Sequence, residues 1–253
     1  MTNDSSLSGK TVLITGGSRN LGEAVARRMV GLGASVAINH YGDGEKAEEL
    51  AEELRARGAR VIALEADVQR SEQAKQLISR TAEALGPVDV LIHCAGPFAM
   101  TPFSQMKEQE WDTILGVNLK AAYLLAREVT PGMKTRGWGR IILMSAGSAF
   151  IRTHSIYSLA KASVMTLTES LALELGPEIT VNAIAPGQIQ ESAAIMDGFE
   201  PGFSERAIQA APLKLLVTRP EVAEMMALIC TSPAMRSVTG HTFVMDGGWR
   251  LMA

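Results

Sequence analysis

The sequence predicts an α/β fold, in which a doubly wound parallel β-sheet carries helices on both of its faces. Short apolar runs, each the length of a buried strand, alternate with longer segments of helical periodicity. A glycine-rich turn joins the first apolar run to the first helical segment. Hydrophobic residues make up 47% of the 253 residues and charged residues 20%, as in an ordinary globular protein. We therefore expect a single domain over residues 1–253.

The first half of the chain contains four expected strands. These apolar runs cover residues 11–15, 35–39, 61–68 and 88–94. The helical segments between them cover residues 21–32, about 45–57 and about 71–85. Gly58 is placed to cap the second of these helices, and Gly86 with Pro87 ends the third. Because each strand is followed by a crossover helix, the strands are expected to pair in parallel.

The second half continues the alternation up to a seventh strand. A long helical region from about 107 to 136 is interrupted near Gly116, and another helix covers about 155–175. The remaining strands are expected at 140–144, 179–184 and 241–246. Residues 187 to about 216 show no clear period. Such a segment is either a substrate-binding loop or a pair of surface helices, and the two interpretations are compatible.

Composition excludes several classes of function. A net charge of −3 argues against a nucleic-acid-binding protein, and no window of about 18 apolar residues predicts a membrane span. The start of the chain, MTNDSSLSGK, is too polar for a secretory signal. Two cysteines, Cys94 and Cys230, make no disulfide framework, and no group of residues has metal-ligand spacing. We expect a cytoplasmic protein without a metal.

The turn T-G-G-S-R-N-L-G at 15–22 has the composition of a phosphate-binding loop. Its glycines let the backbone approach a phosphate, and the following helix offers free N–H groups to a pyrophosphate. The alternative is a structural turn without a ligand. The binding interpretation predicts dinucleotide contacts from Gly16, Ser18, Arg19, Asn20, Leu21 and Gly22.

This turn resembles the TGxxxGxG motif of the short-chain dehydrogenase/reductase family, and the resemblance extends from Lys10 to Trp249. It implies a Rossmann-type fold with a seven-stranded parallel sheet. Asn20 stands where the middle glycine is usual. Asparagine is the residue other than glycine that best tolerates a left-handed backbone, so we expect the turn to keep its shape.

The end of the second expected strand favours NADPH over NADH. NAD-binding members place an acid there to hold the ribose hydroxyls, but this strand ends Asn39-His40-Tyr41, and Asp43 lies further along. Arg19, inside the turn, can bind a 2′-phosphate through two charge-assisted hydrogen bonds. The alternatives are a solvated surface charge for Arg19 and an ordinary loop residue for His40.

The resemblance implies further cofactor contacts. Asp67 would meet the adenine amino group, unless it is simply an acid at a helix N-terminus, and Val68 would pack on the adenine ring. His93 and Cys94 replace the two asparagines that usually precede an Ala-Gly pair in the family. The remaining implied contacts, to the ribose and the nicotinamide, come from Ala95, Gly96, Tyr157, Lys161, Pro186, Gly187 and Ile189.

Tyr157 and Lys161 form the expected catalytic pair, because residues four apart lie on one face of a helix. A free phenol has a pKa of about 10, and a neighbouring ammonium is expected to lower it towards the range useful for acid–base work. The spacing differs from that of the family's enoyl reductases, since Val164 stands seven residues after Tyr157. The resemblance implies that Asn118 orders a water linking Lys161 to solvent; otherwise Asn118 only kinks its helix.

The catalytic serine is ambiguous. Family members carry it about 13 residues before the tyrosine, a count that reaches Met144, whereas alignment on the preceding strand reaches Ala146. We expect Ser145, 12 residues before Tyr157, to bind the substrate oxygen. Ser148 is the alternative, and a chain without a working serine is the third.

Together these residues predict an NADPH/NADP+-dependent carbonyl reductase, most similar to 3-oxoacyl-thioester reductases of fatty acid biosynthesis. A pteridine-reductase-like activity on a C=N bond, with Phe98 as the stacking aromatic, is one alternative. A non-catalytic, cofactor-binding regulatory protein is another. The resemblance also implies a homotetramer or homodimer built on the helices within 107–136 and 155–175. Specificity is expected to lie in residues 94–106, 146–155 and 187–216, and the sequence leaves the substrate and the direction of reaction open.

Overall fold

A computed structural model of the chain describes residues 6–151 and 155–252. It contains a seven-stranded sheet in the order β3-β2-β1-β4-β5-β6-β7, with every neighbouring pair parallel. The predicted doubly wound α/β fold is therefore confirmed. The strands are β1 (Thr11–Thr15), β2 (Ser35–His40), β3 (Val61–Glu65), β4 (Val88–His93), β5 (Gly139–Met144), β6 (Ile179–Pro186) and β7 (Thr242–Met245).

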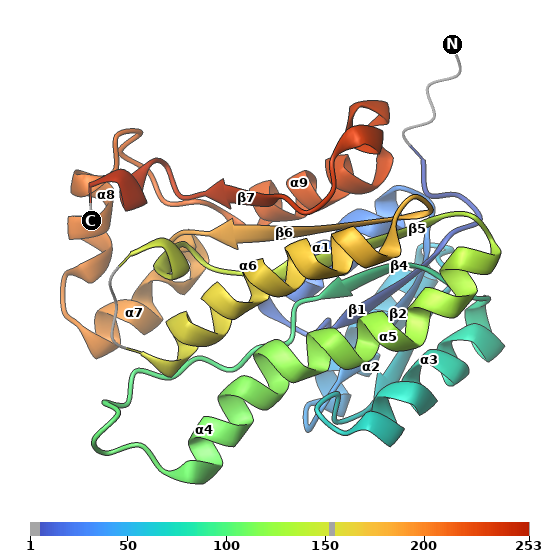
Figure 1. The fold of residues 1–253 in the computed structure, drawn as a ribbon, viewed down its shortest axis with the longest axis horizontal. Helices are drawn as coiled ribbons and strands as arrows, with labels where there is room; N and C mark the ends of the chain where they lie inside the picture. The colour runs from blue at the N-terminus through green and yellow to red at the C-terminus, as the bar shows by residue number, and fades with distance from the viewer. Residues whose placement is uncertain (1–5, 152–154, 253) are drawn as a thin grey trace.

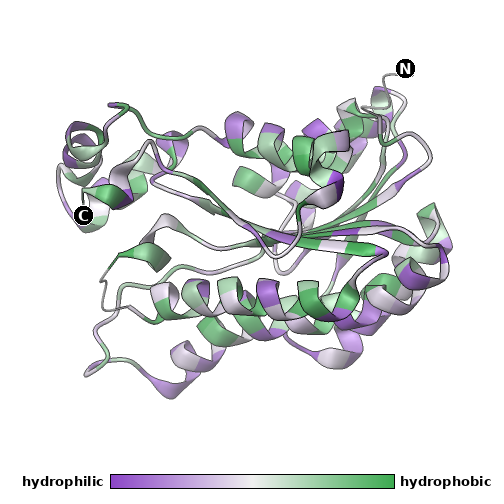
Figure 2. Cartoon of the chain, turned by 45° about the horizontal axis from the view of Figure 1, so that its top comes forward, coloured by the Kyte–Doolittle hydropathy of each residue, from purple (hydrophilic) through white to green (hydrophobic). Residues whose placement is uncertain are grey.

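Helices cover both faces of the sheet and bury one apolar core on each side (Figures 1 and 2). One core includes buried side chains of α1 (Asn20–Gly31), α2 (Gly44–Ala56) and α9 (Arg219–Thr231). The other includes those of α3 (Ser71–Leu85), α5 (Ala121–Thr135) and α6 (Ile156–Leu175). Since both faces are covered, the strands are apolar along nearly their whole length, which is how the sequence reveals them.

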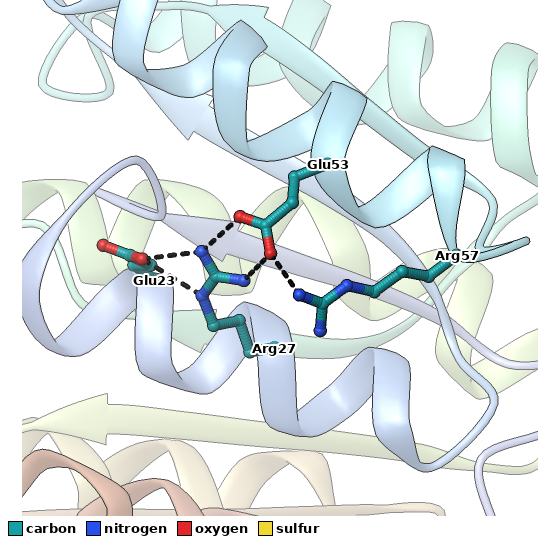
Figure 3. A network of polar contacts seen from close by, with 4 residues as sticks. All are labelled: Glu23, Arg27, Glu53 and Arg57. Carbon is teal, nitrogen blue, oxygen red and sulfur yellow. Dashed lines mark hydrogen bonds and ion pairs between the residues drawn. The ribbon is translucent and has the colours of Figure 1, made fainter.

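A network of ion pairs joins the outer surfaces of α1 and α2 (Figure 3). The Arg27 guanidinium donates to Glu23 at 3.0 Å and to Glu53 at 2.7 Å, and Glu53 also accepts from Arg57 at 2.6 Å. Glu53, and less strongly Glu23, raises the pKa of Arg27. These side chains are partly exposed, so the network orients the two helices more than it stabilises them.

The interruption near Gly116 is a π-helical turn. Helix α4 (Glu108–Leu115) runs into the π turn Gly116–Lys120, which runs into α5. Single π turns often occur at functional sites, and this one contains Asn118. The predicted helical interruption is therefore confirmed.

The structure shortens the third predicted strand, shows the elements within residues 187–216 and adds one helix. The third strand ends at Glu65 rather than at 68, because Ala66 to Val68 leave the sheet. Residues 187–216 contain α7 (Ala193–Phe199) and α8 (Phe203–Ala210), which confirms the helical-pair interpretation and places both beyond the carboxyl ends of the strands (Figure 1). Helix α9 was not predicted. It begins with a capping box between Thr218 and Glu221, a signal that the sequence offers.

Candidate active site

The glycine turn at 15–22 has the backbone shape that close approach to a phosphate requires. Gly16 has a φ of +62°, and a Cβ there would lie 2.8 Å from the Cα of Ala95. At Gly22 a Cβ would lie 2.0 Å from the carbonyl oxygen of Gly16, so only glycine fits. Asn20 has a φ of +53°, so the expected left-handed conformation is confirmed. The turn places the N-terminus of α1 at the carboxyl ends of β1 and β4, where the strand order reverses.

Asp43 contacts this turn, although it lies beyond the end of β2. The buried Ser18 hydroxyl donates to Oδ2 of Asp43. The same oxygen lies 3.7 Å from Nε of Arg19, whose side chain is 63% exposed. An acid therefore stands beside the guanidinium that the sequence analysis assigned to the 2′-phosphate.

The three residues at the end of β2 have different surroundings. The buried Asn39 amide donates to the carbonyls of His40, Leu64 and Ala66, so its side chain ties β2 to β3. His40 is buried, and its Nδ1 has no hydrogen-bond partner among the described residues. Tyr41 is 67% exposed. Of the three, His40 has a polar atom left to bind a ligand, and Tyr41 has an open ring face.

Asp67 and Val68 are both buried where the chain leaves β3. The Asp67 carboxylate accepts from the backbone N–H of Gln69 at 3.2 Å and from Nε of Arg70 at 3.0 Å. Val68 belongs to the core on the α3 side of the sheet. The carboxylate thus already has local partners, as the alternative of an acid at a helix N-terminus predicts.

Four predicted residues, Gly96, Asn118, Tyr157 and Lys161, converge at the carboxyl ends of β4 and β5. A Cβ on Gly96 would lie 2.4 Å from Oδ1 of Asn118 and 3.2 Å from Nζ of Lys161. Lys161 Nζ lies 5.4 Å from the centre of the Tyr157 ring and donates to the carbonyl of Met144 at 2.8 Å. The Asn118 amide donates to Ile114 and Pro97, while its buried Oδ1 has no partner among the described residues.

Burial shifts the pKa values of both Tyr157 and Lys161. It raises the pKa of Tyr157 to about 12 and lowers the pKa of Lys161 to about 8. The expectation that Lys161 lowers the pKa of Tyr157 is therefore wrong for the chain by itself. The physical reason is that desolvation of the phenolate dominates, while the Lys161 ammonium is directed at a backbone carbonyl. At neutral pH Tyr157 is a protonated phenol.

The two serine candidates differ in what their hydroxyls contact. Ser145 is buried, and its hydroxyl donates to the carbonyl of Lys161 at 2.9 Å, within the backbone of α6. In this structure the hydroxyl proton of Ser145 is directed at the backbone of α6, and its expected role toward a substrate oxygen stays a prediction. Ser148 lies in the 3-10 turn Gly147–Phe150, and its buried hydroxyl has no partner among the described residues. Residues 152–154 of the expected specificity region lie outside the described residues.

His93 and Cys94, the two departures from the family pattern, are structural in character. His93 is buried, with Nδ1 2.7 Å from the Thr15 hydroxyl and Nε2 2.9 Å from the carbonyl of Val117. Burial raises the pKa of the Cys94 thiol to about 12, so it is not a ready nucleophile. Within residues 6–151 and 155–252, no group of three or more His, Cys, Asp or Glu side chains could hold a metal ion.

The turn after β6 lies at the same edge of the sheet. Gly187 donates its N–H to Met245 at 2.8 Å, and a Cβ there would lie 2.7 Å from Cβ of Asp246. Ile189 forms an isolated parallel bridge with Val217. Gln188, which the sequence analysis did not select, has a buried amide nitrogen with no partner among the described residues. Both Ile189 and Gln188 thus follow directly on the Pro186-Gly187 turn.

Comparisons with known proteins match this chain to reductases over nearly its whole length. A family model described as enoyl-(acyl carrier protein) reductase matches residues 16–250. The chain is 33% identical over 242 residues to the 3-oxoacyl-[acyl-carrier-protein] reductase of Staphylococcus epidermidis, which covers 94% of this chain and 98% of the relative. The two sequences therefore align over nearly their full lengths.

Solved structures agree with the fold over the whole chain. A blue fluorescent protein from a metagenomic library, in complex with NADPH, superposes with a TM-score of 0.88 at 30% identity, covering 96% of this chain and 99% of that one. A gluconate 5-dehydrogenase from Burkholderia cenocepacia, in complex with NADP and tartrate, has a TM-score of 0.90 at 26% identity, with 99% of each chain covered. Within the described residues, no helix combines the length and apolarity needed to cross a membrane.

Proposed function

Because this chain belongs to the short-chain dehydrogenase/reductase family, we propose that it uses NADPH to reduce the carbonyl group of a 3-oxoacyl thioester or related ketone. The observation that carries this proposal is the convergence of Tyr157, Lys161 and Asn118 beside Gly96, at the carboxyl edge of the sheet. A half-buried phenol next to a buried ammonium and a buried amide suits proton transfer to a carbonyl oxygen.

The residues around the cluster fit a dinucleotide. The left-handed Gly16 and Asn20, with the N–H groups at the start of α1, would hold the pyrophosphate. The exposed Arg19 guanidinium would reach a 2′-phosphate, and Nδ1 of His40, which has no partner in the described part of the chain, lies near the same end. The turn at Gly187, including the buried amide of Gln188, would hold the nicotinamide. When bound, NADPH supplies the hydride that reaches the carbonyl carbon.

The chain's own residues would supply the proton. Tyr157, fully protonated at neutral pH, gives its hydroxyl proton to the substrate oxygen as the carbon is reduced. Lys161, still largely cationic at pH 7, would bind the nicotinamide ribose. Asn118 lies beside Lys161 and would connect it to solvent for reprotonation. A protonated tyrosine suits reduction better than oxidation of an alcohol.

Ser148 is the better candidate for the hydroxyl that orients the substrate oxygen. Its hydroxyl is buried and free of partners within the described part of the chain, whereas Ser145 donates to Lys161. A buried hydroxyl without a partner carries a desolvation cost, which a bound carbonyl oxygen would offset.

A pteridine-reductase-like activity is supported by one contact. The Phe98 ring packs edge-on against Tyr157 with 4.9 Å between ring centres, so it can stack on a planar ligand beside the proton donor. Dihydropterin in the turnover assay below tests this candidate directly. Turnover of any substrate would exclude the purely regulatory, non-catalytic alternative. A cytoplasmic location stays a prediction.

Turnover of an acetoacetyl thioester with NADPH, followed by absorbance with NADH in parallel, tests the proposal. Replacing Tyr157→Phe removes the proton donor and should lower turnover by about 10²- to 10⁴-fold. NADPH binding, followed by fluorescence, should persist because Tyr157 is one contact among many. If wild-type protein binds NADPH but does not turn over the thioester, this substrate class is wrong. If Tyr157→Phe turns over normally, the tyrosine is not the acid.

A further inference from the structure

Two phenylalanines from separate segments meet beside the proton donor. Phe98, in the loop after β4, lies edge-on to Tyr157 with ring centres 4.9 Å apart and planes at 73°. Phe199, the last residue of α7, lies 6.1 Å from Phe98 with planes at 62°. The three rings therefore form a continuous row from α6, across the β4 loop, to α7.

The Phe98 and Phe199 rings do not belong to the apolar cores of the protein. Phe98 is 41% exposed and Phe199 is 61% exposed. Met100 and Ile195, in the same two segments, are also more than half exposed. A patch of large apolar side chains beside a catalytic group marks a surface that binds an apolar ligand. Aromatic rings in this arrangement favour a further ring, through stacked and edge-to-face contacts.

The charge of the segment at 190–210 indicates which chemical class of ligand this surface favours. It contains Glu191, Asp197, Glu200 and Glu205 and one basic residue, Arg206, which pairs with Glu200, while Arg219 of α9 contacts Glu191. A carboxylate or phosphate arriving past α7 would meet like charge. This arrangement favours a neutral ligand over a sugar acid or another anion.

We propose that Phe98 and Phe199 form an aromatic clamp, and that the preferred substrate is a neutral ketone with an aromatic ring next to its carbonyl. The inference rests on the proposed carbonyl reduction and specifies its substrate class. Because Phe98 contacts both Tyr157 and Phe199, a ring that packs on the exposed sides of Phe98 and Phe199 would lie next to Tyr157. The proton then passes from Tyr157 to the carbonyl oxygen while the hydride of NADPH reaches the carbon, as in the proposed function.

Calorimetry on the full chain with NADP+ tests the clamp without turnover, because the oxidised cofactor cannot reduce a ketone. The probes are ethyl benzoylacetate and ethyl acetoacetate, two neutral keto esters that differ by a phenyl group in place of a methyl. We expect the phenyl compound to bind about tenfold more tightly to the wild-type protein. Phe98→Leu and Phe199→Leu should each reduce this ratio by about threefold or more, and Phe98→Tyr should retain it.

Phe103→Leu is the matched control. Phe103 lies in the same loop as Phe98 and is 49% exposed, but its ring packs near Trp111 at 6.5 Å. The control should keep the wild-type ratio of dissociation constants. Equal affinity of the two esters for wild-type protein, no detectable binding of ethyl benzoylacetate, or an unchanged ratio in both leucine variants would overturn the clamp.

Turnover of the same two esters with NADPH separates the two proposals. A protein that prefers the phenyl ester in binding but reduces neither ester retains the clamp and contradicts the proposed function. A protein that reduces both esters but binds them equally retains the proposed function and contradicts the clamp.

Discussion

Arg19 and Asp43 place opposite charges at the turn that we expect to select the cofactor. The guanidinium is exposed and suited to a 2′-phosphate, but Oδ2 of Asp43 lies 3.7 Å from its Nε and also accepts from Ser18. A bound phosphate would compete with the carboxylate for Arg19 and would be repelled by it. We therefore expect Asp43 to reduce the selectivity for NADPH that Arg19 alone would provide.

Replacing Asp43→Asn should sharpen this selectivity. The change removes the negative charge and releases Arg19, so the NADPH-to-NADH ratio of kcat/KM should rise by about tenfold, or ~1.4 kcal/mol. Arg19→Ala is the paired variant and should lower the ratio by a similar factor, acting only on NADPH. Steady-state kinetics with both cofactors provide the measurement. A ratio that does not change in Asp43→Asn would show that Asp43 does not act on the phosphate.

Two serine variants test which hydroxyl binds the substrate oxygen. Ser148→Ala should lower kcat/KM by about 10²-fold, since it removes a donor to the reacting oxygen. Ser145→Ala leaves the carbonyl of Lys161 without its donor, so it should lower thermal stability by about 1 kcal/mol and affect turnover less. Kinetics and thermal melts on both variants measure this. If instead Ser145→Ala lowers turnover more than Ser148→Ala does, Ser145 is the hydroxyl that binds the substrate oxygen.

At the scale of elements, a histidine joins β1, β4 and the π turn. Nε2 of His93 faces the carbonyl of Val117, which can only accept, so Nε2 carries the proton and Nδ1 accepts from the Thr15 hydroxyl. This arrangement requires the neutral ring. It ties the π turn that contains Asn118 to the end of the central strands, so His93 positions part of the site without touching a substrate.

This role predicts a loss of stability in mild acid. Burial, and less strongly the charge of Lys161, lowers the pKa of His93 from 6.5 to about 4. Between those values the unfolded chain binds a proton that the folded chain does not, so stability falls as the pH falls from about 7 towards 4. From pH 7.5 to pH 5, His93 should account for a loss of about 2 kcal/mol.

Urea unfolding at the two pH values measures this loss. His93→Asn removes the titrating ring and should reduce the decrease by about that amount. His241→Asn replaces an exposed histidine and serves as the matched control, which should follow the wild-type curve. If His93→Asn and wild-type protein lose the same stability, the ring is not held neutral in the fold.

At the scale of the whole molecule, helices α5 and α6 leave large apolar side chains uncovered. Leu173 is 90% exposed, Leu159 is 46% exposed and Tyr123 is 45% exposed. The sequence analysis expected a homo-oligomer to form on these two helices. Such exposure is consistent with an interface between copies of the chain.

Leu173→Asp tests this assembly. Because the side chain is already 90% exposed, the substitution should change the unfolding free energy of one chain by less than about 0.5 kcal/mol. We expect light scattering over a dilution series to show a multiple of the chain mass for wild-type protein and a smaller mass for the variant. Wild-type protein that is monomeric throughout would contradict the expectation.

Much of this protein could be predicted from sequence because the signals are local. Apolar runs and helical periods located seven strands and most helices, and the glycine turn predicts where the phosphates of a cofactor would bind. Tyr157 and Lys161 could be paired from their spacing on one helix. Helix α9 was missed although its capping box is visible in the sequence.

Only the tertiary structure decided how distant residues meet. Asp43 contacts Ser18, which is 25 residues away in the sequence, and Ser145 contacts Lys161, which is 16 residues away. Phe199 contacts Phe98, which is about a hundred residues away. The pKa values of Tyr157 and Lys161 follow from burial, which is a property of the packed molecule rather than of any segment. The sequence by itself determined the fold class and the chemical groups available; packing decided which of those groups are free to act, because hydrogen-bond partners and desolvation depend on contacts that no local pattern encodes.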